Sequence, residues 1–472
     1  MGFFKSLFKA VGAVVGAVVG FAVLGPVGLV LGAIGGAVAA GAVADIVSYI
    51  FNPGFDVPGM DSAASQNQGV TVNKDGTNNN LPVIYGRRYV GGSRVAVATS
   101  GSTNEFLWVV FAVSEGEINA FKEVYIDDTL AWSGTSTHGQ QYDATIGKFN
   151  GYLTFQTFHG TENQTASTLA KQSGPGWSDQ HRLKGVAYIT FRFKWYKVAT
   201  QEDQDKTPWR GGIPNITLTV EGRRVAIARN FPDSITRTTE YADEAVAYST
   251  NPVECFLDYM RNPVYGKGLT NDKVDFASFR KESRRINTLD NGNPTPPDLT
   301  QECNAVIFTN RTIMDNVKTF LFNIRAAMPY SQGRFKISLN DNRDDVSRYG
   351  PVSTPVMSFN HDDLIGQVSV NAETNQTKYN RLIVTYMGGS TDQRTTNEPL
   401  EYTWPEPDTT YAADLLAEDN DRVNEQRYTF EHITQLSLAK KIAEVMLAKS
   451  RYRSKTIGFT VGARAQALEI ND

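Results

Sequence analysis

Few residues of this chain combine types and spacings that could carry out chemistry. The five histidines, at positions 138, 159, 181, 361 and 432, form neither an HExxH motif nor a pair at metal-ligand spacing. Neither GxSxG, a P-loop nor GxGxxG occurs. Glu115 and Glu117 could pair as acid and base, although a turn after a strand is the ordinary explanation of SEGEI. We therefore expect no enzymatic activity and no cofactor.

Two further sets of residues could bind a metal or act as nucleophiles. Asp419, Asp421 and Glu425 give part of a DxD calcium pattern, but the glycine and the full ligand series of an EF-hand loop are missing. We therefore expect a solvated loop and no metal there. Cys255 and Cys303 are the only two cysteines, which argues against a disulfide scaffold and a Cys-based zinc site. Both are expected to be core residues rather than nucleophiles.

The N-terminal stretch is strongly apolar. Residues 10–44 include no charged residue, no Ser and no Thr, and they follow Lys5 and Lys9. Pro26 should break this run into two helices, 10–24 and 27–44. Small residues recur at every fourth position, a spacing that lets another helix backbone approach closely. The predicted helix-packing and plug residues are Gly12, Gly16, Gly20, Pro26, Gly28, Gly32 and Gly36.

The two predicted helices are roughly 22 and 27 Å long, slightly short of an apolar bilayer core of about 30 Å. We favour an apolar helical hairpin that associates with itself, and one kinked membrane-spanning helix remains an alternative. Other readings are a secretory signal peptide, an N-myristoylated start at Met1-Gly2 with Ser6, and an ordinary single-pass anchor. The apolar run is much longer than the core of about 7–15 residues usual in signal peptides.

Composition and local pattern predict a mainly β, multidomain protein with α+β parts. The 472 residues have a net charge of −4 and only 20% charged residues, so no basic footprint for nucleic acid is present. The predicted segments are an apolar helical part (1–52), a linker (53–80), barrel-like hub domains (81–100 with 350–472), an all-β insertion (101–235) and an α+β hub domain (236–349).

Individual elements follow from periodicity and turn residues. Helices are predicted within 251–266, 272–287, 311–328 and 435–451, and hairpins within 121–132 and 213–227, with Glu221-Gly222 at the second turn. The 435–451 helix should bury the face formed by Leu436, Ala439, Ile442, Ala443, Met446 and Leu447. Its basic residues should be solvated or paired with acidic neighbours: Lys440, Lys441, Lys449 and Arg451.

Several sequences in a fixed order resemble a known family. They include LPVIYGRRYVGG (81–92), VVFAVSEGEINAFKEVYIDD (109–128), NPVECFLDYMRNPVYGKGL (251–269) and YNRLIVTYMGG (379–389). Over about residues 81–472 the chain resembles the central tail-hub proteins of long-tailed bacteriophages, the family of the lambda-like tip attachment (host-specificity) protein. The resemblance implies a tail-hub architecture with barrel-like domains and a β-sandwich-like insertion.

The same resemblance implies a homotrimer that closes the distal end of a sixfold tail tube. Its expected partners are a hexameric distal tail protein, the C-terminus of the tape-measure protein, and receptor-binding or fibre proteins. We expect a structural virion protein at the tail tip that gates DNA exit without binding DNA specifically. The apolar helices would plug the lumen, enter the host membrane, or do both. The alternatives are a membrane-anchored β-rich surface or secretion protein and a tail-tip cell-wall hydrolase.

Overall fold

The computed structural model describes most of the chain from residue 73 onward. The described residues are 73–75, 79–102, 104–173, 176–197, 200–209, 213–235, 246–288, 301–339, 357–372, 378–388, 399–452, 455–462, 464–465 and 468. They form several sheets with fewer helices, which confirms the predicted mainly β, multidomain class. The predicted N-terminal hairpin and most of the 53–80 linker lie outside these residues. No helix among the described residues is long and apolar enough to span a membrane.

Two sheets enclose the largest β core. The six-stranded sheet has the order β1 (Lys74–Asp75), β4 (Ser93–Ser100), β5 (Phe106–Glu115), β10 (Val186–Lys194), β9 (Leu153–His159) and β8 (Gln141–Asp143). The second sheet has the order β12 (Val246–Tyr248), β11 (Ile216–Ala226), β6 (Ile118–Ile126) and β7 (Thr129–Ser133), with β3 (Arg87–Val90) also on β11. Alternate residues of both sheets share one core, as in a β-sandwich, among them Phe111, Phe155, Phe191, Phe121 and Leu218.

One predicted hairpin is confirmed and the other is wrong. Asp127 and Asp128 join β6 to β7 with φ angles of 46° and 59°, the left-handed backbone that a tight hairpin turn needs. Residues 213–227, in contrast, contain one continuous strand, β11, and Gly222 lies inside it. A Cβ on Gly222 would lie 2.2 Å from the Ile84 carbonyl oxygen. This glycine therefore permits close backbone packing and does not mark a turn.

Residues 81–100 contribute strands to three different ladders. β3 pairs with β11, β4 pairs with β5, and β2 (Val83–Tyr85) pairs with β13 (Ala305–Ile307). Within the described residues, no strand from 81–100 pairs with one from 350–472. The predicted domain boundaries, including the grouping of 81–100 with 350–472, stay predictions.

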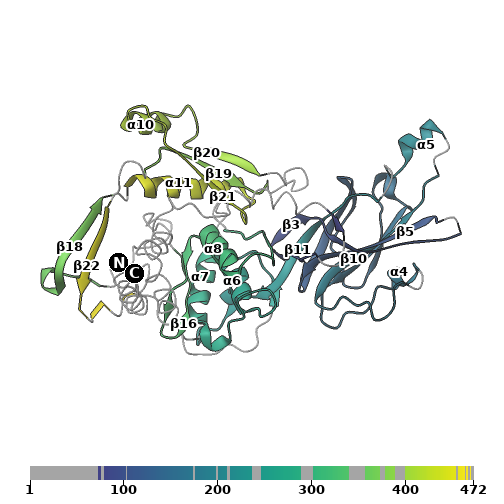
Figure 1. Ribbon diagram of the computed structural model, residues 1–472, viewed down its shortest axis with the longest axis horizontal. Helices are drawn as coiled ribbons and strands as arrows, with labels where there is room; N and C mark the ends of the chain where they lie inside the picture. Colours follow the sequence, from purple (N-terminus) through teal and green to yellow (C-terminus); the bar gives the residue numbers. More distant parts are fainter. Residues whose placement is uncertain are drawn as a thin grey trace, which may run out of the picture.

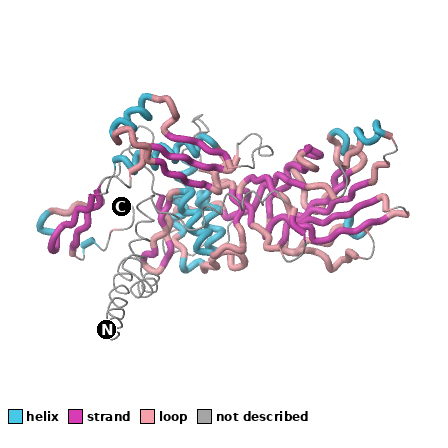
Figure 2. The backbone as a smooth tube through the Cα atoms, turned by 45° about the horizontal axis from the view of Figure 1, so that its top comes forward, coloured by secondary structure: helices cyan, strands magenta, loops and turns pink. Residues whose placement is uncertain are grey.

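The α+β part contains the three helices predicted there. They are α6 (Pro252–Arg261), α7 (Phe276–Thr288) and α8 (Ile313–Ile324), with short strands β14 (Ala326–Ala327), β15 (Tyr330–Ser331), β16 (Arg334–Phe335) and β17 (Ser338–Leu339). Asn251 caps α6 by accepting a hydrogen bond from Val253 N, and Pro252 occupies the first turn. Phe256, Phe276 and Phe320 are fully buried in its core. These helices lie between the sandwich and the C-terminal sheet in both views (Figure 1, Figure 2).

Glu254 of α6 is fully buried, and the surrounding polar groups account for this charge. Arg229 Nη1 lies 2.7 Å from its Oε2, and Ser283 Oγ donates to its Oε1 at 2.8 Å. Ser249 Oγ also donates to this carboxylate. Because a buried carboxylate needs both a counter-charge and hydrogen bonds, this network fixes α6 against α7, Arg229 and Ser249.

The C-terminal sheet has β19 (Arg381–Tyr386) at its centre. β20 (Leu400–Trp404) is antiparallel and β21 (Glu425–Phe430) parallel to it, and helices α10 (Thr410–Glu418) and α11 (Leu436–Tyr452) accompany them. Figure 1 shows α11 alongside this sheet. A separate two-stranded sheet contains β18 (Leu364–Ala372) and β22 (Lys455–Val461). The remaining short helices are α4 (Thr168–Lys171), α5 (Gln201–Lys206), η1 (Gly147–Phe149), η2 (Ala228–Asn230), η3 (Asn271–Lys273) and η5 (His361–Asp363).

The predicted face of α11 is buried except at its first residue. Leu436 is 41% exposed, because it begins the helix at the edge of the core, and Leu438 is buried instead. Three of the predicted basic residues pair with acidic groups: Lys440 with Glu406 at 3.1 Å, Lys441 with Glu444 at 3.3 Å and Arg451 with Asp419 at 2.7 Å.

The β2–β13 ladder and Asn304 join the sandwich to the helical part and to the C-terminal part. In the β2–β13 ladder, Val83, Tyr85, Ala305 and Ile307 belong to the helical core, whereas Ile84 and Val306 belong to the sandwich core. Asn304, immediately before β13, donates from its backbone to His432 O at 3.1 Å and from Nδ2 to Thr434 Oγ1 at 2.8 Å. Its Oδ1 accepts from Arg87 N at 2.8 Å. Asn304 therefore links the sandwich to the segment between β21 and α11.

We predict that Leu447→Asp lowers the free energy of unfolding by more than about 3 kcal/mol and prevents assembly. The side chain is fully buried, so the variant loses apolar burial and places a carboxylate in an apolar core. The matched control is Leu436→Asp on the same helix, whose exposed position should keep the change within about 0.5 kcal/mol. Urea denaturation measures both; equal effects from the two variants would show that this face is assigned wrongly.

Candidate functional site

The β18–β22 ribbon is the most exposed ordered element of the described chain. The two strands pair antiparallel, with Val370 opposite Ile457 and Leu364 opposite Val461, and neither pairs with another described strand. In Figure 1 the ribbon lies at the far left, apart from the sandwich and the helices. A two-stranded sheet without further packing is marginally stable in water. The isolation of this ribbon therefore points to an interaction surface.

The two faces of the ribbon differ in chemistry. Strand alternation and the register place Val368, Val370, Ile457 and Phe459 on one face. These side chains are 44%, 57%, 58% and 47% exposed, respectively. The opposite face presents the uncharged polar side chains of Gln367, Ser369, Asn371 and Thr460, together with Ile365, which precedes a register shift. The ribbon is thus amphipathic, with its apolar face largely uncovered.

The edges of the ribbon are also open. Each strand has only one neighbour among the described strands, so its outer row of backbone N–H and C=O groups has no ladder partner there. Such edges add strands from another chain readily. Assembly with another chain would provide hydrogen-bond partners for the open edges and would cover the apolar face. Sequence alternation contains no signal that the apolar face of these strands is exposed.

The structure does not place the predicted helix-packing residues. Gly12, Gly16, Gly20, Pro26, Gly28, Gly32 and Gly36 all lie outside the described residues. The helical plug, including its hairpin form, therefore stays a prediction.

Asp419, from the acidic pattern predicted at 419–425, forms an ion pair with Arg451. Asp419 accepts hydrogen bonds from Arg451 Nη1 at 2.7 Å and from Asn380 Nδ2 at 2.7 Å. Among the described residues, no group of three or more His, Cys, Asp or Glu side chains is arranged to hold a metal ion. Asp419 thus anchors the end of α11 to the loop after α10.

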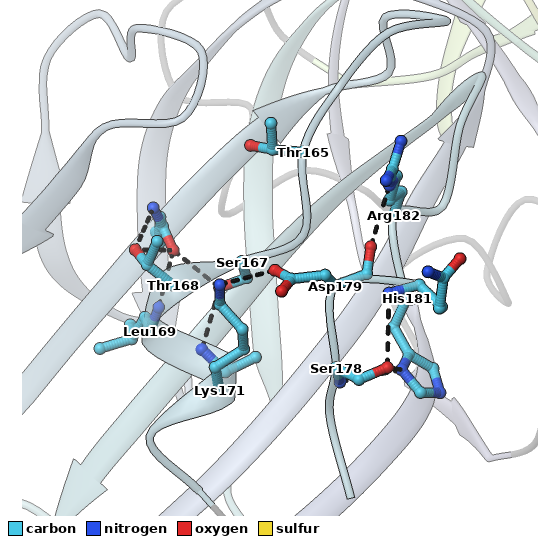
Figure 3. A network of polar contacts seen from close by, with 12 residues as sticks. Thr165, Ser167, Thr168, Leu169, Lys171, Ser178, Asp179, His181 and Arg182 are labelled. Atoms are coloured by element: carbon cyan, nitrogen blue, oxygen red, sulfur yellow. Dashed lines mark hydrogen bonds and ion pairs between the residues drawn. The ribbon is translucent and has the colours of Figure 1, made fainter.

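A loop on the outer face of the six-stranded sheet brings together Ser178, Asp179 and His181 (Figure 3). Ser178 Oγ lies 3.0 Å from His181 Nδ1, a distance at which an imidazole can accept a hydroxyl proton. Asp179, however, pairs with Lys171 of α4 at 2.8 Å, and its backbone oxygen accepts from Arg182. The arrangement therefore fastens the loop to α4, and its carboxylate does not orient the imidazole.

Two other histidines are buried and form part of the packing. His159 Nε2 lies 2.8 Å from Ser136 Oγ, and its ring is 5.7 Å from that of His138. Burial, and then the neighbouring His138 and Arg224, lowers the pKa of His159 to about 4. His432 stacks edge-on against Phe320, with ring centroids 4.8 Å apart. Burial, followed by the nearby Arg88 and Arg311, lowers the pKa of His432 to about 3.

Comparison with known proteins gives one informative relative. The chain is similar to the baseplate hub protein pb3 of Escherichia phage T5, with 24% identity over 450 residues that cover 83% of this chain and 43% of pb3. The chain thus spans less than half the length of that relative. The match supports the expected relationship to phage hub proteins, without supporting the lambda-like proteins in particular. No protein-family model matches the chain.

Among solved structures, a chain titled as the virion of a native gene transfer agent particle is similar. It covers 89% of this chain and 85% of its own length, with a TM-score of 0.46 and 14% sequence identity.

The buried histidines predict a loss of stability in acid. The folded pKa values of His432 and His159 lie below the unfolded value of about 6.5, so below that pH the unfolded chain binds protons that the folded chain does not. The contribution is therefore complete above about pH 6.5 and decreases as pH falls toward the folded pKa values. Between pH 7.5 and 5, each histidine should remove about 2 kcal/mol from the free energy of unfolding.

Urea denaturation of His432→Leu at the two pH values tests this expectation. The variant has one proton fewer to bind on unfolding, so its loss of stability between pH 7.5 and 5 should be about 2 kcal/mol smaller than that of the original chain. His159→Leu should show the same reduction independently. A drop identical to that of the unsubstituted chain in both variants would contradict the predicted linkage.

Proposed function

We propose that this chain is a structural virion protein, a homotrimeric hub at the distal end of a phage tail tube that gates DNA exit. The observation that carries the proposal is the amphipathic β18–β22 ribbon, with its open edges and uncovered apolar face. The similarity to a phage baseplate hub protein supports the class of assembly. The protein would act by assembly rather than by catalysis.

In this proposal the β18–β22 ribbons of neighbouring copies bind to one another. Edge-to-edge pairing provides ladder partners for the open strands, and the apolar residues Val370, Ile457 and Phe459 pack against a second copy. The uncharged polar face, which includes Gln367, Ser369 and Asn371, then faces the lumen. Because none of these three side chains is cationic, DNA phosphates would pass without being gripped.

The apolar N-terminal segment supplies the gate. Two helices with glycine stripes from each of three chains would pack closely on the axis and close the lumen. After the tip opens, the same helices would enter the host membrane, because their backbone groups are satisfied internally. The remaining partners are a hexameric distal tail protein, the tape-measure C-terminus, and receptor-binding or fibre proteins.

The ribbon makes the assembly testable in the purified full chain. Val370→Lys places a charge on the apolar face and should convert a threefold particle to monomers in sedimentation experiments. The thermal midpoint of the monomer should change little, because Val370 is 57% exposed. Asn371→Lys, on the adjacent residue and the opposite face, is the matched control and should leave the trimer intact.

Two results would contradict the proposal that the β18–β22 ribbon forms the subunit contact of a trimer. If Val370→Lys remains trimeric, the apolar face does not form the subunit contact. If the unsubstituted chain is monomeric at high concentration and requires detergent, a membrane-anchored surface protein becomes the better reading.

Deletion of residues 1–44 tests the gate separately. Particles with the shortened chain should assemble and adsorb, because the β-rich body is intact, but should fail to deliver their genome or release it early. Substituting a large side chain at Gly16 or Gly32 should give a weaker form of the same defect, since it separates the packed helices. Normal infection by the deleted particles would rule out both the plug and the membrane role.

A further inference from the structure

Two thiols lie together in the core of the α+β part. Cys255 is on α6 and Cys303 lies two residues before β13, with exposures of 0% and 2%. Cys255 Sγ donates to Ser249 O at 3.7 Å, and Cys303 N donates to Thr250 O at 2.7 Å. Both side chains belong to the same buried core. Both cysteines are therefore fixed to consecutive residues of one segment, and both are free thiols in the structure.

The surroundings make the two thiols unequal. Arg88 is only 4% exposed, its Nε has no hydrogen-bond partner among the described residues, and its guanidinium interacts electrostatically with Cys303. Burial, followed by the contact with Cys303, raises the pKa of the Cys255 thiol. The Cys255 thiolate is therefore disfavoured, and Cys255 is placed to react second.

We propose that Cys255 and Cys303 are a redox pair that remains reduced in the cytosol and forms an intramolecular disulfide outside the cell. The change of compartment rests on the proposed virion function, because cytosolic thiols stay reduced and exposed particles meet oxidising conditions. One disulfide is no scaffold, but it ties α6 to the segment that begins β13. Since β13 pairs with β2, the bond also stabilises the ladder between the two large cores.

The oxidant is a small-molecule disulfide of the glutathione type. The Cys303 thiolate attacks one of its sulfur atoms, forms a mixed disulfide and releases one glutathione thiolate. The Cys255 thiol then loses its proton and displaces the second glutathione. The two protein thiols lose two electrons and two protons, and the oxidant becomes two glutathione molecules. Both steps need transient opening of the core, because both sulfur atoms are buried.

The test uses the purified full chain, incubated with oxidised glutathione and then analysed by peptide mapping without reductant. We expect a peptide containing Cys255 linked to one containing Cys303, loss of both free thiols in denaturant, and a thermal midpoint raised by about 5 °C. Reductant should reverse all three changes. The single variants Cys255→Ser and Cys303→Ser are the controls and should show no such increase in midpoint.

The order in which the two cysteines react is measured separately, by the rate at which each single variant acquires glutathione. Cys255→Ser should acquire glutathione on Cys303 faster than Cys303→Ser acquires it on Cys255. The reverse order would overturn the assigned roles. Thiols that stay free in the folded chain while the unfolded chain oxidises, links formed only between chains, or a lowered thermal midpoint would overturn the redox pair. None of these readouts requires a trimer, so failure of the hub proposal would be recognised separately.

Discussion

The β2–β13 ladder is the element on which the arrangement of the described chain depends, because its two faces belong to different cores. Val83 and Tyr85 point into the helical core, whereas Ile84 between them points into the sandwich. Strand alternation thus fixes two large cores relative to one another through three residue pairs. Asp258 strengthens this contact, since its carboxylate accepts hydrogen bonds from Tyr85, Tyr265 and Arg223, at 2.6, 2.7 and 3.3 Å.

Local sequence signals predicted elements well where the deciding contacts are close in the chain. Helical spacing predicted the helix within 251–266 that the structure shows as α6, and turn residues predicted the hairpin within 121–132. Gly222 was misread because its role depends on the Ile84 carbonyl, more than a hundred residues earlier in the chain. The strand partners of residues 81–100 likewise lie in distant segments, which single-sequence periodicity does not identify.

At the candidate site, too, the features that sequence did not predict depend on contacts between distant segments. The exposure of Val370 and Ile457 depends on which other segments pack against the ribbon, and local sequence does not contain that information. The scattered histidines gave no catalytic pattern, and the structure uses His432 in packing between Phe320 and the Asn304 contact. Burial of Glu254 could not be foreseen from sequence, because its counter-charge Arg229 and its partner Ser283 lie on separate elements.

The entry and exit of the sandwich lie side by side. Gly222 of β11 donates to Gly86 O at 2.7 Å, so the chain enters and returns at neighbouring points beside the ladder, while α5 lies at the far end in Figure 1. The backbone contacts at the base constrain the residues there, whereas the far end of the sandwich does not share this constraint. Insertions and substitutions in the distal loop that carries α5 can accumulate over generations without altering the clamped base. Related chains should therefore vary most at the far end of the sandwich and keep small residues at positions equivalent to Gly86 and Gly222.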